Sequence, residues 1–88
     1  MNVWIFNGSK GRFPSGVFTK RELAEKWIEL HQLSGTLTSY PVDTGIYEWA
    51  IERSFFTISN EKQKLPEFIE SFSSGSLEHY HYENGKLD

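Results

Sequence analysis

The stretch TKRELAEKWIELHQLSGTLTSYPV (residues 19–42) joins a helical pattern to a strand pattern, and it therefore decides the fold class. Its first half repeats apolar residues at helical spacing, namely Leu23, Ala24, Trp27, Ile28 and Leu30. Thr19 and Glu22 have the spacing of a capping box, so we expect the helix to begin at Thr19. Gly35 is expected to end it, because glycine commonly follows the last helical turn.

Strand patterns flank this helix on both sides. Residues 36–42, TLTSYPV, are rich in β-forming side chains, and Pro41 belongs at a strand end or edge because it has no amide donor. Upstream, VWIF (residues 3–6) predicts a strand that ends in an Asn-Gly turn signal. GVF (residues 16–18) predicts a short antiparallel return after a glycine-rich, exposed loop.

Two further helices are expected downstream. Asp43 or Thr44 is placed to cap a helix over residues 46–56. After the polar loop SNEKQK, a third helix is expected over residues 65–72, with Pro66 in its first position. The apolar stripe of this third helix consists of Leu65, Phe68, Ile69 and Phe72.

The end of the chain predicts a last strand. The segment LEHYHYENG (residues 77–85) closes on an Asn-Gly turn signal, and residues 84–88 are expected to trail into solvent. We expect this strand to pair beside residues 3–6, whose apolar faces need a second neighbour. The order strand, strand, helix, strand, helix, helix, strand predicts an α+β fold: a small, mainly antiparallel sheet of about four strands, with helices on one face.

Length and composition bound the possible functions. The 88 residues predict a single domain over residues 1–88, whose core is built from few, large side chains because 16% of the chain is aromatic. The net charge of −3, without a basic run, argues against nucleic acid or an anionic membrane as a partner and suits a basic protein. The absence of cysteine and of a long apolar run at the start predicts a cytoplasmic protein.

The stretch EHYHY (residues 78–82) holds the most conspicuous polar pattern. His79 and His81 share one strand face, where a third ligand such as His31, Asp43 or a glutamate would complete a zinc site. No second spaced ligand pair accompanies them, so we expect the imidazoles to line a half-exposed sheet face.

The alternate row of that strand carries Tyr80 and Tyr82. Tyrosine is easier to bury than a titratable histidine pair, so we expect the tyrosines to point inward, although such side chains also suit an interface. Leu77 falls in the histidine row and conflicts with this pattern, unless the strand begins after it or contains a bulge.

Two other stretches carry candidate chemistry. Arg12 and Phe13, beside Pro14, form either a binding tip or a loop that Phe13 packs onto the core, and packing is the more common outcome. The Asp-Thr-Gly triplet at residues 43–45 resembles an aspartic-protease loop, but such a site needs two carboxylates, so helix capping is expected. Neither a phosphate-binding glycine loop nor a GxSxG nucleophile elbow occurs.

The whole chain except the SNEKQK loop resembles a family of small bacterial proteins known only as a domain of unknown function. The resemblance rests on VWIFNG (3–8), RFPSGVF (12–18), LSGTLTSYPVDTGIYEWAIE (33–52), PEFIESFSS (66–74) and EHYHYENG (78–85). It implies a bacterial, single-domain protein, and it carries over no activity, cofactor or functional residue.

These observations favour a non-enzymatic module without a cofactor that binds a protein partner, regulatory or toxin-neutralising, as a monomer or weak homodimer. Its candidate contact residues are Arg12, Phe13, His79, Tyr80, His81 and Tyr82. The alternative is a small enzyme or metal-binding protein that uses His79 and His81.

Overall fold

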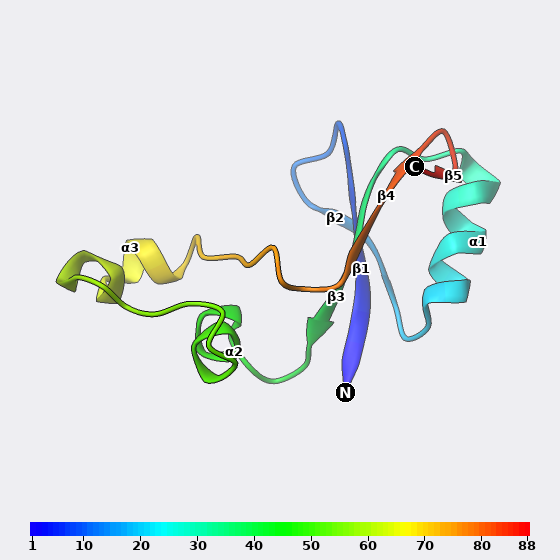
Figure 1. Cartoon of the computed structure of the whole chain (residues 1–88). Helices are drawn as coiled ribbons and strands as arrows, with labels where there is room; N and C mark the ends of the chain where they lie inside the picture. Colours follow the sequence, from blue (N-terminus) through cyan, green and yellow to red (C-terminus); the bar gives the residue numbers. More distant parts are fainter. The chain divides into compact units, whose positions relative to one another are not determined.

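The computed structural model describes residues 1–88 and divides them into two compact units. Residues 1–42 and 77–88 form the first unit, and residues 43–76 form the second. Figure 1 labels the helices and strands along the chain. All the strands, and therefore the whole sheet, belong to the first unit.

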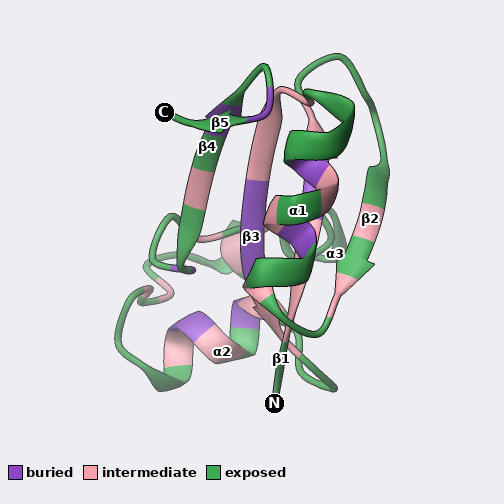
Figure 2. Cartoon of the chain, turned by 90° about the vertical axis from the view of Figure 1, so that its right-hand side faces the viewer, coloured by how far each residue is buried: buried purple, intermediate pink, exposed green.

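The first unit is a five-stranded sheet in the order β2-β1-β3-β4-β5, and every neighbouring pair is antiparallel. The strands are β1 (Asn2–Gly8), β2 (Pro14–Phe18), β3 (Gly35–Pro41), β4 (His79–Glu83) and β5 (Lys86–Leu87). Helix α1 (Arg21–His31) lies across one face of this sheet (Figure 2). The predicted α+β class and antiparallel sheet are confirmed, and Pro41 lies at a strand end as expected.

The C-terminal segment departs from the prediction in two ways. Strand β4 pairs with β3 and not with β1, because β3 occupies the place beside β1 along its whole length, from Asn2↔Pro41 to Gly8↔Gly35. Residues 84–88 do not trail into solvent. Asn84 and Gly85 take positive φ angles of 51° and 86°, a combination typical of a tight hairpin turn, and this turn leads into the fifth strand, β5.

Both predicted ends of helix α1 are wrong. The N-cap is Lys20 and makes no side-chain capping bond, so the Thr19–Glu22 capping box does not form. The helix ends when Gln32 adopts the left-handed conformation at φ 53°, three residues before Gly35. Gly35 instead opens β3, where an added Cβ would overlap the Asn7 carbonyl oxygen of β1. Glycine is therefore required there by the close approach of two strands.

The core of the first unit lies between α1 and the sheet. Its buried members are Phe6, Ala24, Ile28, Leu37 and Tyr82, and Trp4, Phe18, Trp27, Leu33 and Tyr80 pack against them. The predicted helical stripe is only partly buried, since Leu23 and Leu30 remain 49% and 74% exposed. The helix approaches the sheet along the narrow line of Ala24 and Ile28, which leaves the flanking leucines in solvent.

The second unit contains helix α2 (Ile46–Glu52), the 3₁₀ helix η1 (Glu61–Lys64) and helix α3 (Pro66–Ile69). Both α helices are shorter than predicted, although Pro66 does occupy the first turn of α3. The expected cap of α2 is wrong, because Gly45 is its N-cap and Asp43 takes a positive φ of 65°. The polar SNEKQK loop contains η1, whose first turn is capped by the Asn60 side chain.

Aromatic rings hold the second unit together. Tyr47 packs edge-on against Phe72 with ring centroids 5.6 Å apart, and Phe56 lies 4.9 Å from Phe72 and 5.8 Å from Phe68. The Tyr47 hydroxyl donates a 2.8 Å hydrogen bond to the Gln63 carbonyl oxygen, which ties α2 to η1. This unit therefore builds its own small core. In neither unit is any helix long and apolar enough to cross a membrane.

Candidate functional site

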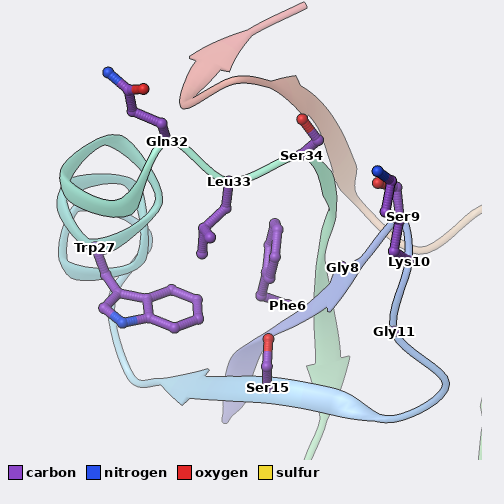
Figure 3. Close-up of a pocket in the computed structure, with 10 residues that line it drawn as sticks. All are labelled: Phe6, Gly8, Ser9, Lys10, Gly11, Ser15, Trp27, Gln32, Leu33 and Ser34. Atoms are coloured by element: carbon purple, nitrogen blue, oxygen red, sulfur yellow. The ribbon is translucent and has the colours of Figure 1, made fainter.

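An apolar groove opens at the end of the sheet where β1 finishes and β3 begins. Figure 3 shows its lining residues: Phe6, Gly8, Ser9, Lys10, Gly11, Ser15, Trp27, Gln32, Leu33 and Ser34. They come from β1, β2, α1 and the two connecting loops. The groove volume is about 450 Å³, within the range of about 300–1,000 Å³ that is usual for ligand pockets.

Three side chains form the apolar interior of this groove. Phe6, Trp27 and Leu33 project into the same space (Figure 3), and the rings of Phe6 and Trp27 meet edge to face with centroids 5.7 Å apart. Phe18 and His31 pack against the Trp27 indole at 5.4 and 5.9 Å, so its ring is supported from two further directions. Trp27 and Leu33 are only partly buried, which leaves apolar surface accessible to a ligand.

The rim of the groove is polar and held by backbone hydrogen bonds. The Ser9 amide donates to the Ser34 carbonyl oxygen at 2.9 Å, and the Gly11 amide donates to the Gly8 carbonyl oxygen at 3.0 Å. These bonds fix the loop that carries Lys10, the only charged residue in the lining. The groove thus has fixed walls before any ligand arrives, which lowers the cost of binding.

A second, more polar hollow lies beside the groove and shares its residues Gly8, Ser9 and Ser34. It has a volume of about 550 Å³ and is lined additionally by Asn7, Gly35, Thr36, His81, Tyr82, Glu83 and Asp88. Two of the residues singled out from the sequence, His81 and Tyr82, therefore lie at this end of the sheet.

The histidines of β4 point to the face of the sheet opposite α1, as predicted. Both are exposed, while Tyr82 is buried and Tyr80 partly buried. The imidazole centroids of His79 and His81 lie 5.4 Å apart, with the rings nearly perpendicular. Leu77 is buried although it falls in the histidine row of the sequence pattern. It precedes the first residue of β4, so the alternation of the strand does not apply to it. No group of three or more His, Asp or Glu side chains is placed to hold a metal ion.

Hydrogen bonds orient both imidazoles. The Nδ1 atom of His79 lies 2.7 Å from the Leu77 carbonyl oxygen, and that of His81 lies 3.3 Å from the Thr36 hydroxyl oxygen. A carbonyl oxygen only accepts, so Nδ1 of His79 carries a proton, and in the neutral form of the ring its Nε2 presents a lone pair. The Thr36 hydroxyl can accept from His81 in the same way, which would also free Nε2 of that ring.

A family model described as a domain of unknown function (DUF7710) matches residues 3–88. The chain belongs to the DUF7710 family. The match includes the second unit, the first unit from residue 3 onward and every residue of the groove, and it confirms the expected membership of an uncharacterised family. Neither a curated protein nor a solved structure matches the chain.

In this DUF7710 chain the two tyrosines of β4 connect the sheet to α1. The Tyr82 hydroxyl donates a 2.6 Å hydrogen bond to a Glu25 carboxylate oxygen, and burial together with this bond raises the pKa of Tyr82 to about 12. Arg21 pairs with the same carboxylate at 3.3 Å and places its guanidinium 3.6 Å from the centre of the Tyr80 ring. Tyr80 and Tyr82 thus both help to pack β4 against helix α1.

The structure places Phe13 in solvent, so the expected packing of this ring onto the core is wrong. Phe13 is 73% exposed, and its ring centroid lies 5.7 Å from the Arg12 guanidinium carbon. The rings of Phe18 and Trp27 already fill the core side of β2, where they would crowd even a Cβ at Gly16. The exposed pair Arg12–Phe13 lies on the loop between β1 and β2 (residues 9–13, the groove loop), which also carries Lys10.

The residues that line the groove were not candidates from sequence alone. One available signal was that Trp27 and its stripe offered more apolar surface than one short helix can bury. The other was the glycine- and serine-rich loop before Arg12, which carries a lone lysine. Neither signal shows that the apolar surface of Trp27 and the glycine- and serine-rich loop lie side by side in the fold.

Proposed function

We propose that this chain is a non-enzymatic, cytoplasmic binding module of bacterial origin, and that it docks a regulatory or toxin-neutralising protein partner at the groove. The observation that carries the proposal is the accessible apolar surface of the partly buried Trp27 and Leu33, which Phe6 supports from the core, between walls held by backbone hydrogen bonds. Burying such surface is the main source of free energy in protein association. The lack of cysteine supports a reducing compartment.

A protein suits this site better than a small molecule because exposed apolar surface continues beyond the groove. Phe13, which directly precedes the edge strand β2, is 73% exposed. A partner that fills the groove and extends along the loop before this strand would cover this side chain. A stable protein interface buries about 800 Å² on each partner, which the groove alone does not provide.

A groove-filling substitution tests this proposal. Ser15 lines the groove from β2, so Ser15→Tyr places a ring in the space that the partner would use. Ser59→Tyr, at an exposed position of the second unit, is the matched control. We expect a partner captured from the native host, then purified, to bind the wild type and the control equally and to lose at least tenfold in affinity for Ser15→Tyr. The proposal fails if the partner binds all three alike, or if no stoichiometric partner is captured.

A second candidate function is metal binding by His79 and His81. The supporting observation is that each Nδ1 has a partner within the protein, while the rings lie 5.4 Å apart on one exposed face. Two imidazoles bound through nitrogen to one tetrahedral zinc ion have ring centres about 5 Å apart. Water or a partner's side chain would supply the remaining ligands.

Calorimetric titration of untagged protein with Zn²⁺ and Ni²⁺ tests this candidate. We expect one binding site that His81→Ala removes and that His31→Ala, on α1, leaves unchanged. A dissociation constant weaker than about 1 mM for both ions, or equal binding by the two variants, contradicts it.

A further inference from the structure

The groove is cationic in a chain that is acidic overall. The net charge is −3, yet all twelve acidic residues lie between Glu22 and Asp88. Residues 1–21, which contain β1, the groove loop and β2, carry four basic side chains and no acid. The hairpin that forms one side of the groove therefore has the opposite charge to the rest of the chain.

The cations beside the groove are not neutralised by the protein. Lys10 lines the groove itself, and Arg12 follows two residues later on the same loop. The ion pairs in the structure are Arg21–Glu25 and Lys64–Glu61, so neither loop cation has a carboxylate partner. Arg12 lies over the face of the exposed Phe13 ring in a cation–π arrangement. Both charges are available to a partner.

The polar rim matches the same ligand chemistry. Ser9 and Ser15 line the groove beside the apolar interior, the Ser34 hydroxyl accepts a 2.9 Å bond from the Asn84 amide, and no carboxylate lies among the lining residues. Serine hydroxyls and an unpaired ammonium group favour an anion, while the accessible surface of Trp27 and Leu33 favours an apolar side chain. An apolar cavity with a cation at its edge is complementary to an apolar group that has a carboxylate nearby.

We infer that the groove recognises an acidic protein segment, in which one apolar side chain packs on the accessible surface of Trp27 and Leu33 and neighbouring carboxylates pair with Lys10 and Arg12. This inference rests on the proposed function and adds the chemistry of the partner to it. The inferred partner is acidic, whereas the net charge of −3 suggested a basic one. The local charge at the contact, and not the net charge, decides complementarity.

Selection from a random peptide display library tests the inference, with the intact chain as bait. The charge-reversed variant K10E/R12E is selected in parallel, and Lys62→Glu, in η1 of the second unit, is the control for reversing a charge away from the groove. The groove-filled variant Ser15→Tyr identifies which peptides use the groove. Circular dichroism and a thermal melt establish that each variant is folded.

We expect wild type and Lys62→Glu to enrich groove-dependent peptides with an apolar residue next to Asp or Glu. K10E/R12E should enrich the same apolar residue next to Lys or Arg, and should bind the acidic peptides about tenfold more weakly, the effect of reversing two exposed ion pairs. Raised salt should weaken the acidic peptides and leave purely apolar ones unaffected.

Two results overturn the inference, and they differ in what they say about the proposed function. If groove-dependent peptides appear without an acidic bias, or with the same bias in K10E/R12E, the partner chemistry is wrong while the proposed docking site stands. If no enriched peptide distinguishes wild type from Ser15→Tyr, the inference and the groove as a docking site both fall.

Discussion

Replacing Tyr82 by phenylalanine should weaken the attachment of β4 to helix α1. The side chain is only 6% exposed, and its hydroxyl donates to Glu25 at 2.6 Å. A hydrogen bond to a charged acceptor is worth about 1.5–3 kcal/mol. The Glu25 side chain is 34% exposed and keeps Arg21 as a partner, so water can replace part of the loss. We therefore expect the free energy of unfolding to fall by about 1–2 kcal/mol at pH 7.

The same bond predicts a loss of stability at alkaline pH. The pKa of Tyr82 is raised from 10.0 to about 12 in the folded protein, first by burial and then by its bond to Glu25. A raised folded-state pKa means that this contribution to stability is complete below pH 10 and is lost as the pH rises toward 12. A shift of two units corresponds to about 2.7 kcal/mol at most. Tyr82→Phe cannot ionise and should lack this part of the decline.

Urea unfolding followed by far-ultraviolet circular dichroism measures both effects, at pH 7 and at intervals from pH 9 to 12. Tyr80→Phe is the matched control at pH 7, because the Tyr80 hydroxyl bonds only to the exposed Glu78; its stability should change by less than about 0.5 kcal/mol. Equal unfolding midpoints for wild type and Tyr82→Phe at pH 7 would refute the reasoning. A parallel alkaline decline of the two proteins would refute the titration argument.

Two further substitutions and one deletion test the architecture, each by urea unfolding. Gly35→Ala should cost about 2 kcal/mol or more, since the new Cβ overlaps the Asn7 carbonyl oxygen, and an unchanged midpoint would contradict that close approach. Deleting residues 84–88 removes the hairpin turn and β5 and should cost more than about 1 kcal/mol; a neutral deletion would show that β5 adds nothing. Leu37→Ala should cost about 2–5 kcal/mol, because this side chain is fully buried. Leu30→Ala, at a 74% exposed position, should stay within about 0.5 kcal/mol, and similar losses for the two would contradict the assigned core.

The candidate site was less predictable than the fold. From sequence, the histidines and tyrosines of β4 were placed on opposite faces correctly, because side chains alternate along a strand whatever its neighbours are. The groove was not foreseen. Its apolar interior joins Phe6, Trp27 and Leu33, which come from a strand, a helix and a loop.

The sequence by itself determined the local features of this protein. Apolar spacing placed helix α1 and included Ala24 and Ile28 in its apolar stripe, and the Asn-Gly pair at residues 84–85 specified a tight turn. Pro66 began a helix because its ring fixes φ and lacks an amide donor. Each of these outcomes depends on a few neighbouring residues, so it can be derived without knowing the rest of the chain.

Only the tertiary structure decided the features that depend on distant partners. The length of β1 and the place of β4 follow from β3, which takes the position beside β1 that the sequence assigned to the last strand. The capping box at Thr19 is lost, and Gly35 serves strand contact instead of helix termination. Strand pairing and cavities arise from groups brought together by folding, and their free energies outweigh the weaker local preferences of capping and turn residues.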